Sequence, residues 1–343
     1  MKITVLTHLE SEASKAADVV VEQVASGLRE HGHDVSILGV YRDIEKLVNG
    51  LTKPRPDLVF NLMEMFGDDN FGDVDVAGML DLMDLPHTGG GAGEIFLRQD
   101  KGLAKKLLAF DGILYPKYAV FPRNAGFETG GNLRMPMFVK PLRLDASMGI
   151  DGKSLVEDAT ALMKKVIQIH ETLNDSALAE EYIDGREFYV GILGNAEPQA
   201  LPIIELDFSG LPEGAPRVAD SRAKWVKGSA EYRGTRSVLA DLPDETRAKL
   251  HKVALGAYRA LRVRDYGRVD LRLTETGDIY VIEVNASCYL ERSSEFSVAA
   301  AAAGIAYPDL LQRIVQLAKD RYNEEKAVPK RRRSQRTTGH GPG

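Results

Sequence analysis

Short apolar runs alternate with amphipathic segments over the first ninety residues, and this alternation constrains the fold most strongly. Residues 2–7 (KITVLT) are typical of a buried strand, and residues 12–30 then carry apolar side chains at helical spacing. Two more strands are predicted at 33–40 and 57–63, followed by a helix at 75–84. This strand–helix–strand order predicts a parallel sheet with right-handed crossovers, and therefore an N-terminal α/β domain.

The rest of the chain predicts two more blocks of mixed helices and strands after a glycine-rich loop at 87–93. Helices are expected at 99–110, 157–171, 244–261 and 308–322, and strands at 117–121, 137–142, 177–183, 186–193, 200–208, 266–274 and 278–285. We divide the chain into residues 1–97, 98–185 and 186–322, and a basic tail at 323–343 that we expect to be disordered.

The composition is that of an ordinary globular protein, with 343 residues of which 44% are hydrophobic and 27% charged. A single cysteine, Cys288, excludes an intramolecular disulfide framework and fits a reducing compartment. No apolar run approaches the ~18 residues of a membrane span, and the N-terminus turns polar too early for a signal peptide. The net charge of −6 gives no general attraction to nucleic acid. We expect a cytoplasmic protein with no membrane partner.

Residues 266–287 (YGRVDLRLTETGDIYVIEVNAS) predict a hairpin that sets two carboxylates side by side. Two alternating strands flank Thr276-Gly277, whose glycine can supply the positive φ of a two-residue turn. With that turn, Asp270 lies opposite Glu283, and Arg268 lies opposite Asn285. The other, packed face then holds Val269, Leu271, Leu273, Tyr280, Ile282 and Val284.

Two carboxylates opposite each other destabilise a hairpin unless something compensates their charge. A divalent cation held by Asp270, Glu283 and the Asn285 amide would do so, because Mg²⁺ takes oxygen ligands. Arg268 would then supply a fixed positive charge for an anion bound beside the metal. The alternative is a solvated hairpin face whose acids pair with Arg268 and Arg272, and the pattern alone leaves both open.

Six segments follow one another along the chain: MLDLMDLPHTGG (79–90), QDKGLAKKLL (99–108), FVKPLRLDASMGI (138–150), LAEEYIDGREFYVGILGN (178–195), AKWVKGSAEY (223–232) and the hairpin at 266–287. In this order and spacing they resemble the D-alanine–D-alanine ligase branch of the ATP-grasp superfamily. The resemblance implies an α/β ATP-grasp fold, in which the N-terminal parallel α/β domain precedes a central lid and a C-terminal catalytic subdomain that sandwich ATP. It also implies ATP with Mg²⁺ or Mn²⁺ as cofactors, and a homodimer.

The resemblance assigns phosphate-binding roles to two lysines and one loop. Lys101 and Lys140 match lysines that reach the ATP phosphates, where a positive charge offsets the polyanion. Ser147, Met148 and Gly149 match the small-residue loop that closes over the phosphates with its backbone N–H groups.

Further matches concern the adenine, the ribose and the phosphates. Glu180 matches the acceptor of the adenine amino group, and Glu181 and Ile183 match the segment whose backbone reads the adenine edge. Glu187 matches the ligand of the ribose hydroxyls, and Lys224 lies in a loop that folds toward the phosphates.

The hairpin residues take catalytic roles in the resemblance. Arg268 matches the arginine that steadies the oxyanion of an acyl intermediate, while Asp270, Glu283 and Asn285 match the Mg²⁺ ligands. The candidate catalytic residues are therefore Arg268, Lys224 and Ser147.

The substrate-contacting positions depart from the family pattern. The glutamate in the loop after the first strand has no direct counterpart, because Ala13 stands there with Glu10 and Glu12 nearby. A serine–tyrosine pair of the family is replaced by Ala146 and Trp225. These changes indicate that the first substrate differs.

The second half of the substrate site also differs. A His-Gly pair is replaced by Met63-Glu64, and Tyr289 stands where a glycine lets a backbone N–H approach the reacting carbonyl. Ser294 matches the serine that binds the second substrate's carboxylate, but Glu295 follows it in place of an apolar residue. The candidate substrate residues are Glu12, Trp225, Tyr289 and Ser294.

The expected function is an ATP-dependent carboxylate–amine ligase that forms an amide through an acyl-phosphate, acting on altered amino-acid or peptide-like small molecules. Two alternatives remain open: a D-alanine–D-alanine ligase proper, and an ATP-binding regulator that does not ligate.

Overall fold

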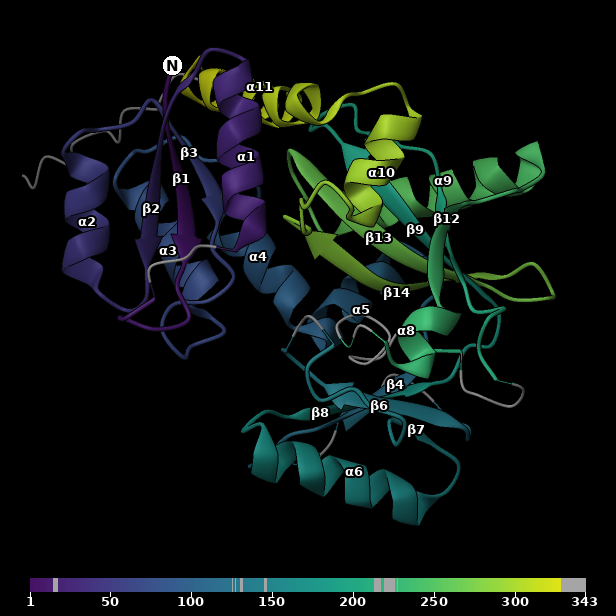
Figure 1. Ribbon diagram of the computed structural model, residues 1–343. Helices are drawn as coiled ribbons and strands as arrows, with labels where there is room; N and C mark the ends of the chain where they lie inside the picture. The colour runs from purple at the N-terminus through teal and green to yellow at the C-terminus, as the bar shows by residue number, and fades with distance from the viewer. Residues whose placement is uncertain are drawn as a thin grey trace, which may run out of the picture.

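The computed structural model describes residues 1–14, 18–124, 126, 128–129, 132–144, 147–212, 217–218, 226 and 228–327. Three parts are visible in Figure 1: an N-terminal domain around β1–β3, a C-terminal part around β9–β14, and a lower lobe in which α6 covers the sheet of β4–β8. No helix within the described ranges is long and apolar enough to cross a membrane.

The N-terminal sheet is parallel with strand order β2-β1-β3, which confirms the sequence prediction. Successive residues of β1 face opposite sides, so Val5 packs against α1 while Leu6 packs with the core beneath α2 and α3. The elements are β1 (Lys2–His8), α1 (Val19–Glu30), β2 (Asp34–Val40), α2 (Ile44–Thr52), β3 (Leu58–Leu62) and α3 (Gly72–Leu82).

Three helices of this region begin at places the apolar spacing did not indicate. The helix predicted from residue 12 starts at Val19, because the Asp18 carboxylate accepts a hydrogen bond from the Val20 N–H and caps it. The short helix α2, which we did not predict, is capped in the same way by Asp43. The glycine-rich segment contains the start of α4 (Ala92–Gln99).

The lower lobe is a five-stranded antiparallel sheet of order β5-β4-β8-β6-β7. Val166 and Ile169 of α6 fill the core against one face of this sheet. Its elements are β4 (Tyr118–Phe121), β5 (Glu128–Thr129), β6 (Met137–Pro141), β7 (Leu155–Val156), α6 (Ala159–Thr172) and β8 (Ala177–Glu181).

The C-terminal part is built on a sheet of order β12-β11-β9-β13-β14, with β10 pairing to β9. One face carries α9 and the other carries α10 and α11. The elements are β9 (Arg186–Leu193), β10 (Gln199–Ala200), β11 (Ile204–Asp207), α8 (Ala230–Gly234), β12 (Arg236–Leu239), α9 (Asp244–Ala260), β13 (Tyr266–Leu273), β14 (Ile279–Ala286), α10 (Glu295–Ala302) and α11 (Tyr307–Ala327).

Two features cross the expected domain boundaries. The helix α5 (Lys101–Phe110), assigned from sequence to the central part, packs Leu108 into the core beneath α9. The last helix, α11, continues to Ala327 and so extends five residues into the segment expected to be a disordered tail. Residues 328–343 lie outside the described residues.

A buried polar network joins the N-terminal domain to the C-terminal part. The Asp265 carboxylate, fully buried, accepts from the Gly89 N–H at 2.9 Å and from Arg321 Nη2 at 2.9 Å. Arg321 also donates to the His87 carbonyl, and the Tyr322 hydroxyl lies 2.8 Å from His87 Nδ1. The glycine-rich segment is thereby fixed against β13 and α11.

Asp265→Asn should lower the free energy of unfolding by roughly 3–5 kcal/mol, because it leaves the buried Arg321 guanidinium without its counter-charge. Asparagine tolerates the φ of +63° at this position, so the backbone is not the cause of the loss. Urea denaturation measures the change. Asp244→Asn, at an exposed ion pair with Arg247, is the matched control and should cost less than about 1 kcal/mol. Equal losses in the two variants would contradict the role assigned to the network.

His87 should make stability depend on pH. Burial, with the Arg264 charge, lowers the pKa of His87 from 6.5 to about 4. The unfolded chain therefore binds a proton first, so stability is complete above pH 6.5 and is lost as the pH falls toward 4, by on the order of 3 kcal/mol. Urea denaturation from pH 7 to pH 4.5 should show a smaller fall for His87→Gln than for the wild type. Parallel curves would contradict this prediction.

Candidate functional site

The β13–β14 hairpin places the predicted side chains opposite each other, but its turn and its strand pairing differ from those expected. Asp270 pairs with Glu283, and Arg268 pairs with Asn285. The turn is longer than two residues, since the Thr274 N–H bonds to the Asp278 carbonyl. A bulge opposite the Asp270–Leu271 step takes up the extra residue and restores the register.

The bulge changes the packed face of β14 near the turn. Ile279 and Val281 are buried there, whereas Tyr280 and Ile282 are only partly buried. The prediction that Tyr280 and Ile282 lie on the packed side is therefore wrong, because it assumed a two-residue turn and an unbroken alternation. Beyond the bulge the alternation holds, and Val284 is buried as predicted.

Asp270 is buried and is held by its neighbours on the hairpin. Arg268 donates to it from Nε at 2.7 Å and from Nη2 at 2.9 Å, and Asn285 donates from Nδ2 at 3.2 Å. The Arg268 guanidinium also stacks on the ring of Tyr189, 4.6 Å from the centroid. Burial alone would lower the pKa of Arg268, but the carboxylates of Asp270 and Glu295 outweigh it and raise that pKa well above its ordinary value.

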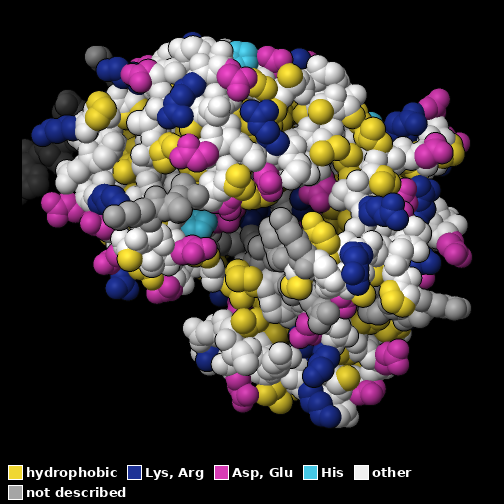
Figure 2. Space-filling model, viewed as in Figure 1, with side chains coloured by type: hydrophobic (Ala, Val, Ile, Leu, Met, Phe, Trp, Pro, Cys, Tyr) yellow, Lys and Arg dark blue, Asp and Glu magenta, His cyan; other side chains and the backbone are white. Residues whose placement is uncertain are grey.

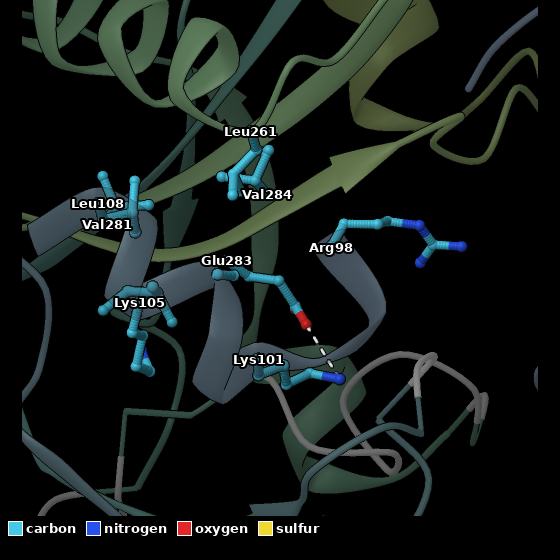
Figure 3. Close-up of a pocket in the computed structure, with 10 residues that line it drawn as sticks. Arg98, Lys101, Lys105, Leu108, Leu261, Val281, Glu283 and Val284 are labelled. Carbon is cyan, nitrogen blue, oxygen red and sulfur yellow. Dashed lines mark ion pairs between the residues drawn. The ribbon is translucent and has the colours of Figure 1, made fainter. Parts of the chain in front are cut away.

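Glu283 faces a lysine from another part of the molecule. Its Oε1 lies 3.5 Å from Nζ of Lys101, which also donates to the Leu144 carbonyl at 2.9 Å. Figure 3 shows the Glu283 side chain reaching from β14 toward Lys101 on α5. The pocket drawn there, about 10 Å³, has space for roughly one water molecule. The ion pair thus joins α5 to the hairpin.

Two lysines hold the buried carboxylate of Glu180. Lys105 Nζ lies 2.8 Å from one oxygen and Lys140 Nζ lies 3.1 Å from the other. Burial would raise the pKa of Glu180, but the two ammonium groups outweigh it and lower that pKa. Burial lowers the pKa of Lys105. Sequence reasoning missed Lys105, although it lies one helical turn after Lys101.

Glu187 belongs to a second buried ion pair, with Arg272. The Arg272 Nη2 donates to Glu187 at 2.7 Å, and its Nη1 donates to the Ile183 carbonyl at 2.8 Å. The Tyr189 hydroxyl donates to the other Glu187 oxygen at 3.0 Å. Arg272 thus pairs with Glu187 on the neighbouring strand β9, which the hairpin pattern alone could not reveal. The Glu181 N–H bonds to the Lys117 carbonyl at 2.8 Å.

The small-residue loop is described from Ser147 onward. Ser147 and Gly149 both adopt a positive φ, and Met148 is exposed. A side chain at Gly149 would collide with Leu173 and Pro141, so only glycine fits this turn. Ala146, Lys224 and Trp225 lie outside the described residues.

The candidate substrate residues fall in different settings. The Tyr289 hydroxyl donates to Asp18 at 3.1 Å, and so joins the segment after β14 to the start of α1. Ser294 caps α10 by accepting from the Ser297 N–H. Glu12 is exposed, 3.5 Å from the exposed Arg42. The acid that contacts Tyr289 is therefore Asp18, a residue that sequence reasoning did not select.

The donor set on the hairpin fits a hard divalent cation. Two carboxylates and an amide share one face of β13–β14, and rotating the Asn285 amide would present its oxygen. Among the described residues, no group of three or more His, Cys, Asp or Glu could hold a metal by itself. Such an ion would therefore depend on Asn285 and on ligand oxygens. A hollow lined by acidic and basic side chains lies between the lower lobe and the rest of the molecule (Figure 2).

Comparisons with known proteins agree with the resemblance found in the sequence. The family model described as D-Ala–D-Ala ligase C-terminus matches residues 107–316. An uncharacterized protein of Sinorhizobium fredii is 31% identical over 309 residues, 88% of each chain. The D-alanine–D-alanine ligase of Acidiphilium cryptum is 30% identical over 323 residues, 92% of this chain and 98% of that one.

The fold agrees with a solved structure as well. The D-alanine–D-alanine ligase of Bacillus anthracis, in complex with ATP, matches with a TM-score of 0.76 at 23% identity, covering 95% of this chain and 99% of that one. This confirms the predicted α/β ATP-grasp fold. The chain belongs to the D-alanine–D-alanine ligase family, whose members are ATP-dependent, ADP-forming ligases.

Proposed function

We propose that this protein uses ATP and Mg²⁺ to join a carboxylate to an amine through an acyl-phosphate, with substrates other than two D-alanines. One observation carries the proposal. Acidic and basic side chains from separate parts of the chain meet here. Lys101 of α5 pairs with Glu283 of the hairpin. Lys105 of α5 and Lys140 of β6 both pair with Glu180 of β8.

The lysines are suited to a polyanionic nucleotide. Lys105 and Lys140 share one carboxylate, so this trio carries a net positive charge. Lys101 and Lys140 would contact the phosphates, with the backbone of Ser147, Met148 and Gly149 closing over them. By the family resemblance, Lys224 would also approach the phosphates.

The base and the ribose would lie along the edge of the lower lobe. The backbone of Glu181 and Ile183 would face the adenine, near Glu180. Glu187 would bind the ribose hydroxyls. Because Arg272 already holds one Glu187 oxygen and Tyr189 the other, the carboxylate is fixed in orientation before any ligand arrives.

Asp270, Glu283 and Asn285 would hold the metal, which when bound neutralises phosphate charge. Arg268 would steady the oxyanion of the acyl group, and Asp270 and the Tyr189 ring fix its guanidinium in orientation. The substrate carboxylate attacks the γ-phosphate and releases ADP. The amine then attacks the acyl carbon, the bond from that carbon to the phosphate oxygen breaks, and phosphate and a proton leave.

The substrate half supports a changed specificity. Tyr289 replaces the glycine of the family pattern, and its hydroxyl is engaged by Asp18. Burial and the Asp18 charge raise the pKa of Tyr289, so it stays a neutral donor at physiological pH. A bulky side chain anchored to α1 reshapes the space in which a donor such as D-alanine would lie.

Asp270→Asn and Glu283→Gln should each reduce phosphate release from ATP by at least about 100-fold, or about 2.7 kcal/mol of transition-state stabilisation. The assay supplies ATP, Mg²⁺, a pool of amino acids and hydroxylamine, which traps an acyl-phosphate as a hydroxamate. Thermal melting checks that both variants fold. The control is Asp278→Asn, in the exposed turn of the same hairpin, which should keep full activity.

Full activity in both variants would refute the metal assignment. Nucleotide-dependent thermal stabilisation of the wild type, without a hydroxamate from any amino acid, would refute the ligase proposal and leave a nucleotide-binding regulator.

Tyr289→Gly should raise the yield of D-alanine hydroxamate at least about tenfold over the wild type, because it removes the bulk that displaces this donor. Tyr289→Phe is the matched control, since it keeps the ring and loses only the hydrogen bond to Asp18. Mass spectrometry of the products measures both. A similar gain in the two variants would show that the hydrogen bond, rather than the bulk, sets donor specificity.

A further inference from the structure

Arg268 has a carboxylate on two sides. Asp270 takes its Nε and Nη2, and Oε2 of Glu295 lies 3.5 Å from its Nη1. The Arg268 side chain is 14% exposed and that of Glu295 is 28% exposed, so this second pair faces the open part of the site. The chain itself therefore places two carboxylates around this one guanidinium.

Glu295 is held in this position by three elements. The Ser237 hydroxyl of β12 donates to its Oε1 at 3.1 Å, Arg268 of β13 approaches its Oε2, and the residue itself begins α10. The preceding Ser294 is also engaged within the chain, because its hydroxyl donates to the Ser297 hydroxyl at 3.2 Å and caps the helix. Arg268 and Ser294, the two groups here that could bind a substrate carboxylate, therefore both have partners within the chain.

We propose that the Glu295 carboxylate takes the place beside Arg268 that the carboxylate of an amino-acid acceptor would need, so that the acceptor is a primary amine without a neighbouring free carboxylate, such as an amino-acid amide. This inference rests on the proposed ligase function. An acceptor carboxylate would add a third anion around one guanidinium and would be repelled.

The chemistry of the second step is the same for an acceptor that lacks a carboxylate. The neutral amine attacks the acyl carbon, the carbon–nitrogen bond forms and the bond to the phosphate oxygen breaks. Phosphate leaves and the amine proton passes to solvent. Glu295 does not touch the reacting atoms in this scheme; it determines which amines can approach Arg268.

The test compares D-alaninamide with D-alanine, two amines of equal size that differ in the carboxylate. Calorimetry on the full chain with Mg²⁺ and ADP measures the affinity of each probe for the wild type, Glu295→Gln and Glu295→Leu. The wild type should bind D-alaninamide at least about tenfold more tightly. Both variants should reduce this ratio by about tenfold, mainly through tighter binding of D-alanine. Binding of D-alanine at the donor position would add the same contribution in every form, so only the change in D-alanine affinity between the wild type and the two variants is assigned to the acceptor position.

Glu245→Gln removes one exposed acidic charge on α9, far along the chain from these residues, and should leave the ratio unchanged. Equal affinity of the wild type for the two probes, binding of neither probe, or an unchanged ratio in Glu295→Gln would overturn the inference. The hydroxamate assay separates it from the ligase proposal, because hydroxylamine has no carboxylate. If the wild type forms a hydroxamate but does not prefer D-alaninamide, only the inference about the acceptor is refuted. If it prefers D-alaninamide but forms no hydroxamate, the ligase proposal is refuted.

Discussion

Mutual repulsion between Asp270 and Glu283 is the constraint around which the site is organised. The two carboxylates lie opposite each other on β13 and β14, and each is matched by a cation. Arg268 comes from the same strand as Asp270, whereas Lys101 comes from α5. Because like charges opposite each other destabilise a sheet, these cations are part of what lets the hairpin fold. The charge arrangement that suits a metal and a nucleotide also accounts for the position of α5.

The same principle recurs in the other buried ion pairs. Glu180 is held by Lys105 and Lys140, and Asp265 is held by Arg321. Each joins segments that are distant in the sequence, and each would leave a costly uncompensated charge if one partner were lost. Ion pairs thus connect the lower lobe to α5, while Asp265 and Arg321 hold the glycine-rich segment through hydrogen bonds to its backbone. Such contacts specify one relative position, because ion pairs tolerate little displacement.

Much of the fold could be predicted because it follows local patterns. The parallel N-terminal sheet follows from alternation of apolar runs, and the opposition of Asp270 and Glu283 follows from strand periodicity. The predicted turn length was wrong, and Asp270 lies opposite Glu283 only because the bulge takes up the extra residue. Neither turn nor bulge could be deduced from apolar alternation, because residues 275–278 are exposed and Thr274 is only partly buried, so the turn gives no burial signal.

Partners distant in the sequence could not be predicted. Lys105 and Arg272 read as ordinary surface charges until the structure places Glu180 and Glu187 beside them. Asp18 falls inside the helix predicted over residues 12–30, and only the packing of the segment after β14 against the start of α1 brings Tyr289 to it. The family resemblance singled out Glu180 and Glu187 together with Lys140, but it did not single out Lys105 and Arg272, which complete the ion pairs of these two acids.

The helix α5 contacts both the C-terminal part and the lower lobe. Leu108 is fixed in the core beneath α9, while the Gly102 carbonyl accepts from the Tyr118 hydroxyl of the lower lobe and Lys105 reaches Glu180 there. A displacement of the lower lobe relative to the C-terminal part would therefore have to break either the Lys105–Glu180 contact or the packing of Leu108. This one short helix therefore couples the position of the lower lobe to the core beneath α9.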